Sequence, residues 1–432
     1  MAIPSVRVGV IGAGNVGAAL VGLLLDPARR VALEDAATAS LELSAVAVRD
    51  AHRARPGIPP ALLTGDAAAL AREGEIDVLV EVAGGLQPAG ELIEAALSRG
   101  VSVVTANKAL MAQRGTALAR LAHAHGADLF YEAAVGGAVP ILRALRSSLA
   151  GERIERVLGI VNGTTNFILS QMTDGGLDYD EALAEAQARG YAEADPTADV
   201  EGYDAAAKVL ILASLAFGTE LRDETIARQG IARIRGYDVE FARRAGYVIK
   251  LLAVAERVGA HGLSRRVHPA MVPADHPLAA VHGAMNAVFV EGTVAGPLMW
   301  LGAGAGGGPT ATAVLGDILD AARNRVSGRH DVPFLVDDTL ERVPAGDLTS
   351  VYYLSLDVVD QPGVLATVAG VFAAHHVSIQ SMAQSGVGEE ARLSFVTHRA
   401  RESDMEATVR ALTTVPAVDS IGVRLRVIEG GA

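Results

Sequence analysis

Short apolar runs alternate with helical patterns over the first third of the chain. Helix-period segments lie at Val16–Leu25, around Pro88–Arg99 and in a stretch that runs through His123. Strands that alternate with helices form parallel sheets, so residues 1–140 are predicted to form a Rossmann-type, doubly wound nucleotide-binding domain. The predicted strands are Val6–Ile11, Leu43–Val48, Val78–Val82, Val101–Thr105 and Asp128–Tyr131. Ligands of such sheets bind at the carboxyl ends of the strands.

The pattern changes after Pro140. A helix to Leu149 and a strand at Arg156–Val161 lead into mixed elements that continue to Trp300. We expect residues 141–300 to form an α+β domain. The glycine-dense stretch LGAGAGGGP at 301–309 precedes a regular helix at Thr310–Arg325. A flexible linker is the alternative, but a helix directly after it favours residues 301–326 packing back onto the first domain.

The C-terminal part has the element order of a small independent unit. Residues 327–350 are polar and are predicted to be a linker. From 351 to 428 the pattern is strand, helix, strand, strand, helix, strand, which is typical of a ferredoxin-like fold. The complete chain is therefore predicted to be an α/β protein with three parts.

Composition narrows the class of function. A chain of 432 residues is too long for one core, and its net charge of −13 argues against nucleic acid and anionic membranes as partners. No apolar run approaches the ~20 residues of a membrane span, and the N-terminus leads directly into a strand, so we expect a cytoplasmic protein. The chain has no cysteine, which excludes disulfides, thiolate metal sites and a covalent thiol mechanism.

A dinucleotide motif follows the first predicted strand. In Gly12-Ala-Gly14-Asn15-Val16-Gly17, the first glycine permits a tight turn, the second admits a pyrophosphate and the third allows close packing of helix on strand. The acidic residue that usually holds the adenosine ribose lies about 20 residues later, whereas Asp50 lies farther away. Its neighbour Arg49 could instead hold a 2′-phosphate. We favour NADP over NAD, and both remain open.

The segment around Tyr203–Phe217 contains charges in an apolar helix. Asp204 and Lys208 are four residues apart and so share one face. A lysine on such a face either extends to solvent or points into a cavity, and a half-buried structural ion pair is the alternative. The preceding loop is acidic and carries Glu193 and Asp199. Lys108 follows the end of a predicted strand, where ligands are expected.

Four segments together resemble the homoserine dehydrogenase family. They are VGVIGAGNVG at 8–17, TANKALMA at 105–112, VNGTTNFIL at 161–169 and the stretch from 190 to 218. The terminal unit resembles an ACT domain, an amino-acid-sensing module, through the D-x-P-G-V-L pattern at 360–365. The resemblance covers nearly the whole chain in the family's order.

The resemblance implies roles for individual residues. It implies residues 141–300 as the domain for substrate binding, catalysis and dimerisation. It implies Lys208, Asp204 and Lys108 as catalytic residues and Glu193 and Asp199 as substrate-binding residues. The backbone of Gly163 and Thr164 could bind the substrate carboxylate. Cofactor contacts are expected at Gly12, Gly14, Asn15, Val16, Gly17, Arg49, Gly84, Thr105, Lys108 and Gly306. The backbone carbonyls of Glu132, Val135, Gly137 and Val139 match positions that hold a sodium ion in this family.

The implied reaction is the reversible, NAD(P)H-dependent reduction of L-aspartate 4-semialdehyde to L-homoserine, on the route to threonine and methionine. Lys208 is a candidate general acid, because desolvation lowers the pKa of a lysine, and Asp204 would orient it and limit that lowering. The absence of cysteine separates this interpretation from aspartate semialdehyde dehydrogenase, which acts through a cysteine. An amino-acid sensor that no longer catalyses is the alternative from another class.

The ACT unit is expected to bind an effector, with threonine as the first candidate. The loop Asp360–Gly363 opens onto a helix N-terminus, which suits an amino-acid carboxylate. A unit used only for oligomerisation is the alternative. A homodimer or a homotetramer is expected, and the sequence does not decide between them.

Overall fold

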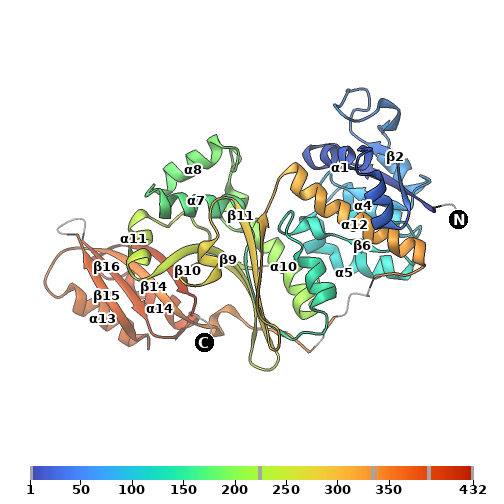
Figure 1. Ribbon diagram of the computed structural model, residues 1–432. Helices are drawn as coiled ribbons and strands as arrows, with labels where there is room; N and C mark the ends of the chain where they lie inside the picture. The colour runs from blue at the N-terminus through green and yellow to red at the C-terminus, as the bar shows by residue number, and fades with distance from the viewer. Residues whose placement is uncertain (1–2, 222–225, 332–335, 338, 387–390, 430–432) are drawn as a thin grey trace.

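The computed structural model describes residues 3–221, 226–331, 336–337, 339–386 and 391–429. Figure 1 shows the N-terminal part with α1 and β2 at one end, a long sheet in the middle and a small α/β unit at the other end. Among the described residues, no helix is both long and apolar enough to cross a lipid bilayer.

The first sheet contains six parallel strands in the order β3-β2-β1-β4-β5-β6. This is the doubly wound arrangement that the alternating pattern predicts. Its strands are β1 (Ser5–Ile11), β2 (Ser40–Ala47), β3 (Leu63–Thr64), β4 (Val78–Glu81), β5 (Ser102–Thr105) and β6 (Leu129–Phe130). Its helices are α1 (Asn15–Leu25), α2 (Arg30–Ala37), α3 (Ala67–Arg72), α4 (Ala89–Leu97) and α5 (Lys108–Ala124). The short helices α2 and α3 were not predicted individually.

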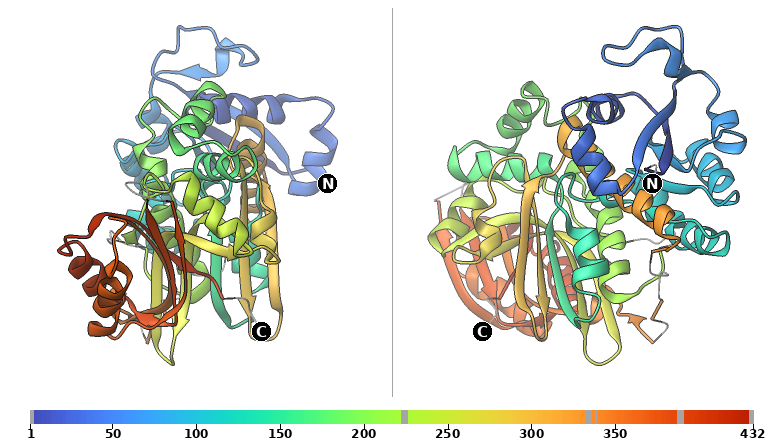
Figure 2. Two further views of the ribbon diagram at one scale, coloured as in Figure 1. Left: turned by 90° about the vertical axis from the view of Figure 1, so that its left-hand side faces the viewer. Right: turned by 45° about the vertical axis from the view of Figure 1, so that its right-hand side comes forward.

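A long helix from later in the chain completes this layer. Helix α12 (Gly307–Ser327) packs along α1, and its apolar residues Val314 and Ile318 share a buried cluster with Val8 and Leu20. Figure 2 shows α12, in orange, beside the blue helices of the first sheet. The glycine-dense stretch is therefore the turn between strand β12 (Gly296–Ala303) and this helix.

The second sheet continues from the middle of the chain into the C-terminal unit. Its order is β12-β11-β7-β9-β10-β18-β14-β16-β15. The central strands are β7 (Ile154–Ile160), β9 (Tyr247–Val258), β10 (Gly262–Pro273), β11 (Met285–Gly292) and β12, and the short strands β8 (Ala227–Arg228) and β13 (Glu341–Arg342) pair with β10. The helices on this part are α6 (Ile141–Arg143), which continues as a π-turn at Ala144–Ser148, α7 (Gly163–Asp174), α8 (Tyr179–Ala188), α9 (Thr197–Val200), α10 (Tyr203–Phe217) and α11 (Gly236–Arg244).

The C-terminal unit has the predicted β-α-β-β-α-β order. It contains β14 (Thr349–Val358), α13 (Val364–Ala374), β15 (Ile379–Ser385), β16 (Arg392–Thr397), β17 (Ala400–Arg401), α14 (Glu402–Leu412) and β18 (Val418–Val427). Strand β18 pairs with β10 through Ala270 and Met271, so the unit joins the central sheet. The predicted linker at 327–350 lies partly outside the described residues, and β14 begins within its last two positions.

Candidate functional site

Two lysines from distant parts of the chain meet at one carboxylate. Asp204 lies in the first turn of α10, and its Oδ2 accepts from Lys208 Nζ at 2.6 Å. Its Oδ1 accepts from Lys108 Nζ at 2.7 Å, from the first residue of α5 just beyond β5. The helical spacing therefore brings Asp204 and Lys208 together as predicted, and the sheet topology adds Lys108.

The surroundings of the two lysines differ. Lys208 is buried, and its ammonium also donates to the carbonyl of Val161 at 2.6 Å. The side chain of Lys108 is 47% exposed. Only three of the 37 lysines and arginines in this chain are lysines, and two of the three bind Asp204. Arginine remains protonated in proteins whereas lysine can release a proton, so this pair suits proton transfer.

The electrostatics of the cluster are dominated by Asp204. Burial disfavours its charge, but the two lysines outweigh burial and hold the pKa of Asp204 well below its usual range. Burial likewise disfavours the charge of Lys108, but Asp204 outweighs it, and with Asp199 and Glu193 it raises the pKa of Lys108. The free site therefore contains an ammonium group held between acidic residues.

The acidic loop predicted to bind an ammonium group lies beside this cluster. Asp199, in α9, accepts from Asn162 Nδ2 at 2.7 Å, and the same nitrogen donates to Asp204 at 3.0 Å. Glu193 is exposed. Gly163 and Thr164 begin α7, and the Thr164 hydroxyl donates to the carbonyl of Tyr191 in the acidic loop. Asp199 thus contacts the cluster through Asn162, and the start of α7 contacts the acidic loop.

The glycine motif has the geometry of a phosphate-binding turn. Gly12 has φ +103°, and a Cβ there would lie 2.8 Å from the Ala83 nitrogen, while a Cβ on Gly17 would lie 2.1 Å from the Gly12 carbonyl. A Cβ on Gly14 would meet nothing within 4 Å, so open space lies over the N-terminus of α1. Unpaired N–H groups at that helix end can bind a pyrophosphate. The turn therefore fits a dinucleotide.

The second glycine-dense turn approaches the first. Gly306 has φ +120° and precedes α12, and a Cβ on Gly307 would lie 2.8 Å from the carbonyl of Asn15. The N-termini of α1 and α12 are therefore neighbours. This juxtaposition agrees with the expectation that residues 301–326 return to the first sheet.

One buried carboxylate at this edge was missed by sequence reasoning. Glu81 ends β4, and its Oε1 accepts from the N–H groups of Ala83 and Gly84 at 2.9 and 2.7 Å. Its Oε2 accepts from the Thr105 hydroxyl at 2.7 Å. The Thr105 hydroxyl is thus occupied by a hydrogen bond to Glu81. Glu81 therefore holds both the loop that contains Gly84 and the end of β5 that precedes Lys108. An acidic residue at the end of an otherwise apolar strand was the available signal.

Arg49 and Asp50 follow β2, and their geometry differs. The Asp50 carboxylate accepts from the N–H groups of His52 and Arg53 at 3.0 and 3.3 Å, so it closes a local turn. Arg49 is exposed. Asp50 is exposed as well, and both of these contacts use the same carboxylate oxygen, so the two alternatives from the sequence both stay open.

The four predicted cation-binding carbonyls lie on one tight loop. Gly136 and Gly137 have φ +74° and +58°, and a Cβ on Gly137 would lie 2.7 Å from Gly304. The Glu132 carboxylate accepts from the N–H groups of Leu142 and Arg143, and its carbonyl accepts from the Val135 N–H at 3.4 Å. From the described residues, the carbonyls of Val135 and Gly137 accept no hydrogen bond. Oxygen donors of this kind fit a hard cation.

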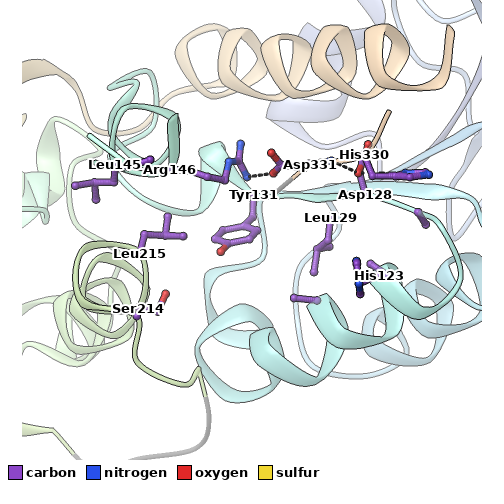
Figure 3. A pocket seen from close by; sticks show the side chains of 15 residues that line it. His123, Asp128, Leu129, Tyr131, Leu145, Arg146, Ser214, Leu215, His330 and Asp331 are labelled. Atoms are coloured by element: carbon purple, nitrogen blue, oxygen red, sulfur yellow. Dashed lines mark hydrogen bonds and ion pairs between the residues drawn. The ribbon is translucent and has the colours of Figure 1, made fainter. Parts of the chain in front are cut away.

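A cavity of about 290 Å³ lies at the opposite end of α10 (Figure 3). Tyr131 points into it, and Arg146 binds Asp331 at its rim at 3.1 Å. Burial raises the pKa of Tyr131 to about 12. The cavity is lined by Ser214 and Leu215 rather than by Asp204 or Lys208, and residues 332–335, directly after Asp331, lie outside the described residues. We assign it no role.

Comparison with known families covers most of the chain. The model described as homoserine dehydrogenase matches residues 140–319, and its NAD-binding domain matches residues 12–132. An ACT domain matches residues 352–417. The homoserine dehydrogenase of Corynebacterium glutamicum is 46% identical over 426 residues, which cover 98% of this chain and 95% of that protein.

The chain belongs to the homoserine dehydrogenase family.

Other relatives agree with this assignment. The homoserine dehydrogenase of Mycobacterium tuberculosis is 47% identical and covers 98% of each chain. The solved homoserine dehydrogenase of Thiobacillus denitrificans superposes with a TM-score of 0.92 at 38% identity over 98% of both chains. A hyperthermophilic archaeal homoserine dehydrogenase in complex with NADPH covers 73% of this chain and 97% of its own, with a TM-score of 0.62 at 28% identity.

Membership in the homoserine dehydrogenase family confirms the resemblance seen in the sequence. The chain is an NAD(P)-dependent oxidoreductase of amino-acid biosynthesis with a nicotinamide cofactor. The predicted fold class is also confirmed: a Rossmann-type domain, a mixed-sheet catalytic part and a C-terminal ACT domain.

Proposed function

We propose that this enzyme catalyses the reversible, NAD(P)H-dependent reduction of L-aspartate 4-semialdehyde to L-homoserine. The observation that carries the proposal is the pair of lysines on Asp204 beside an acidic loop. The substrate is an amino acid, so its ammonium calls for carboxylates and its aldehyde for a proton donor. When bound, the reduced nicotinamide supplies the hydride.

The chain's own residues have three tasks in this reaction. Glu193 and Asp199 bind the substrate ammonium, and the N–H groups at Gly163 and Thr164 face its carboxylate. Lys208 donates a proton to the aldehyde oxygen as negative charge develops there, with Asp204 fixing the ammonium. Lys108, half exposed and bound to the same carboxylate, orients the carbonyl between substrate and cofactor.

The test is NADPH oxidation by the purified enzyme with aspartate semialdehyde. We expect turnover, and a kcat lower by about 10²-fold or more in Lys208→Ala, which is the usual scale for losing a general acid. A folded wild-type enzyme that binds NADPH but does not turn over would favour the sensor alternative. An unchanged kcat in Lys208→Ala would move the acid role to Lys108 or to water.

For the cofactor we propose a preference for NADP. The support is that the exposed Arg49 cation follows β2, where one oxygen of Asp50, which is also exposed, closes a local turn. We expect a KM for NADPH below that for NADH. The Arg49→Ala variant should have a higher KM for NADPH and an unchanged KM for NADH. Equal Michaelis constants for the two cofactors would contradict the role of Arg49.

We further propose a sodium ion at the carbonyls of Glu132, Val135, Gly137 and Val139. The support is the tight loop at Gly136 and Gly137, where both residues have positive φ. Among the described residues, no group donates a hydrogen bond to the carbonyls of Val135 and Gly137. The ion would stabilise the loop between β6 and α6. Thermal stability should rise with NaCl more than with an equal concentration of choline chloride.

We also propose that the ACT unit senses an amino-acid end product, with threonine as the first candidate. The loop Asp360–Gly363 at the N-terminus of α13 supports this, since a helix N-terminus suits a carboxylate. Titration of the full chain with threonine should lower activity, whereas a unit used only for assembly would give no response.

The exposed edge strand β15 supports assembly as a dimer or tetramer, and light scattering would distinguish the two.

A further inference from the structure

Asn162 lies between the two carboxylates of the site. It follows β7 and is 5% exposed. Its Nδ2 donates to Asp199 Oδ1 at 2.7 Å and to Asp204 Oδ2 at 3.0 Å. A single amide group therefore contacts both the acidic loop and the catalytic helix.

The orientation of this amide is fixed by the helix that it caps. Asn162 Oδ1 accepts from the Thr165 N–H at 2.9 Å and from the Thr165 hydroxyl at 3.0 Å. A backbone N–H can only donate, so the amide oxygen must face α7. Its nitrogen must then face Asp199 and Asp204, and a flipped amide would lose both sets of contacts.

The contacts around Asp204 leave its carboxylate little freedom. Lys108 holds one oxygen, while Lys208 and Asn162 hold the other. Rotation of this carboxylate would break contacts to both lysines. The other hydrogen of the Asn162 amide holds Asp199, so this residue determines the spacing between the ammonium-binding loop and the proton donor.

We propose that Asn162 is a positioning residue for the reaction. It aligns Asp199, which binds the substrate ammonium, with the Asp204–Lys208 pair that acts on the aldehyde. The proposal rests on the function proposed above, because it assumes an amino-acid substrate that extends from one group to the other. Correct placement of reacting groups contributes strongly to rate, and a misplacement of about 1 Å can cost 10²-fold.

Two substitutions separate positioning from helix capping. Serine and aspartate are both good N-cap residues, so Asn162→Ser and Asn162→Asp keep an acceptor for the Thr165 N–H but lose the amide donor. For Asn162→Ser we expect kcat/KM for the semialdehyde to fall by about 10²-fold. The thermal midpoint and the Kd for NADPH should stay close to wild type. Asp66→Ser at α3, a remote cap with the same type of contact, is the control for capping.

The pH dependence of kcat/KM in Asn162→Asp tests the positioning role, because a purely structural role would not change it. Its carboxylate would face Asp199 and Asp204, and like charges so close raise the pKa of a carboxyl group. Protonation restores an O–H donor toward one of them, so the ratio of variant to wild-type kcat/KM should rise as pH falls. Asn162→Ser should show no such rise.

The outcomes are distinguishable. A wild-type enzyme without turnover would refute the proposed function before any variant is compared. An active wild type with full kcat/KM in Asn162→Ser would overturn the positioning role alone. The positioning role would also be overturned if both variants lost thermal stability and NADPH affinity as strongly as activity.

Discussion

Asp204 is the residue on which the site depends, because three side chains from three elements donate to it. Lys208 comes from the same helix, Lys108 from the start of α5 and Asn162 from the end of β7. Burial opposes the charge of Lys108, but Asp204 outweighs it and raises the pKa of Lys108, so this lysine keeps its positive charge beside the anion. In the proposed reaction, a substrate aldehyde that enters this cluster meets an ammonium group that Asp204 already holds in place.

Replacing each of the two lysines, Lys208 and Lys108, by arginine should have different effects. Arg retains the positive charge but does not release a proton, so it can replace a lysine that acts by charge and not one that acts as an acid. We expect Lys208→Arg to lower kcat about 10²-fold, and Lys108→Arg, at a half-exposed position, to raise KM with a smaller effect on kcat. Steady-state kinetics at saturating NADPH measure both.

If Lys108→Arg lowered kcat more than Lys208→Arg did, Lys108 would be the proton donor. Binding of NADPH, followed by fluorescence, serves as the control that each variant still forms the cofactor site. A variant that fails to bind NADPH reports on the cofactor site, of which Lys108 is a predicted part, and not on proton transfer.

Contacts within one helix could be predicted, and contacts between strand ends could not. The i to i+4 spacing of Asp204 and Lys208 follows from helix geometry alone. Glu81 ends β4 in the first sheet, whereas Asn162 follows β7 in the second, and nothing local in the sequence says which side chains face them. Their roles required the strand order and the loop conformations.

At the scale of elements, the cofactor site depends on two helix N-termini that lie together. Helices α1 and α12 are separated by most of the chain, and Gly307 permits the contact with Asn15. A regular helix directly after the glycine-dense stretch indicated this packing. The missed helices α2 and α3 are short, and short helices show little periodicity.

Gly307→Ala should weaken cofactor binding. A Cβ there would lie 2.8 Å from the Asn15 carbonyl, so α12 must shift away from α1. We expect a higher KM for NADPH with little change in kcat at saturation. The neighbouring Gly308 is the matched control, because a Cβ there meets nothing within 4 Å. If Gly308→Ala raised KM equally, helix propensity and not the close approach would be the cause.

A buried acid joins helix α11 to the ACT sheet. Asp238 is 1% exposed and accepts from the hydroxyls of Tyr353 and Ser355 at 2.8 and 2.9 Å. Burial raises its pKa from 3.8 to about 6, although the N–H of Arg235 and these hydroxyls oppose the rise, as does the charge of Arg392. The folded chain therefore holds a proton at this contact that an unfolded chain would release above about pH 4.

The contribution of Asp238 to the free energy of unfolding should fall as pH rises. The folded pKa exceeds the unfolded one, so the favourable contribution of Asp238 is complete below pH 3.8 and is lost as pH rises through about 6. Asp238→Asn should thus gain stability relative to wild type across this window, by up to about 3 kcal/mol. Chemical unfolding over a pH series measures the difference. The exposed acid Asp347 is the control, and a pH-independent difference for Asp238→Asn would contradict the assignment.

At the scale of the whole molecule, the ACT unit is continuous with the catalytic sheet. The sequence predicted a separate unit that could fold alone, and nothing local indicated that β18 pairs with β10. One segment extends this contact toward the site. Gln229 and Arg233 donate to the carbonyls of Arg424 and Ile421 in β18, each at 2.8 Å.

The same segment contacts the acidic loop. The Ile231 N–H donates to the carbonyl of Val200 at 2.9 Å, and a Cβ on Gly230 would lie 2.4 Å from that carbonyl. Val200 directly follows Asp199 in α9. A shift of β18 on effector binding would therefore reach Asp199, the carboxylate proposed to bind the substrate ammonium, through contiguous packed backbone.

Removing the two side-chain contacts to β18 should uncouple the effector from the site. In the double variant Gln229→Ala/Arg233→Ala, we expect threonine to inhibit several-fold less, while kcat without effector stays close to wild type because neither side chain contacts the catalytic cluster. Coupling free energies between such sites are typically about 1–3 kcal/mol, so loss of one route is measurable as a shift in the inhibition curve. Arg244→Ala on α11, an exposed residue paired with Glu240, is the control. Inhibition that is unchanged in the double variant would place the coupling in the Asp238 contact, and the Asp238→Asn enzyme should then show the weakened response instead.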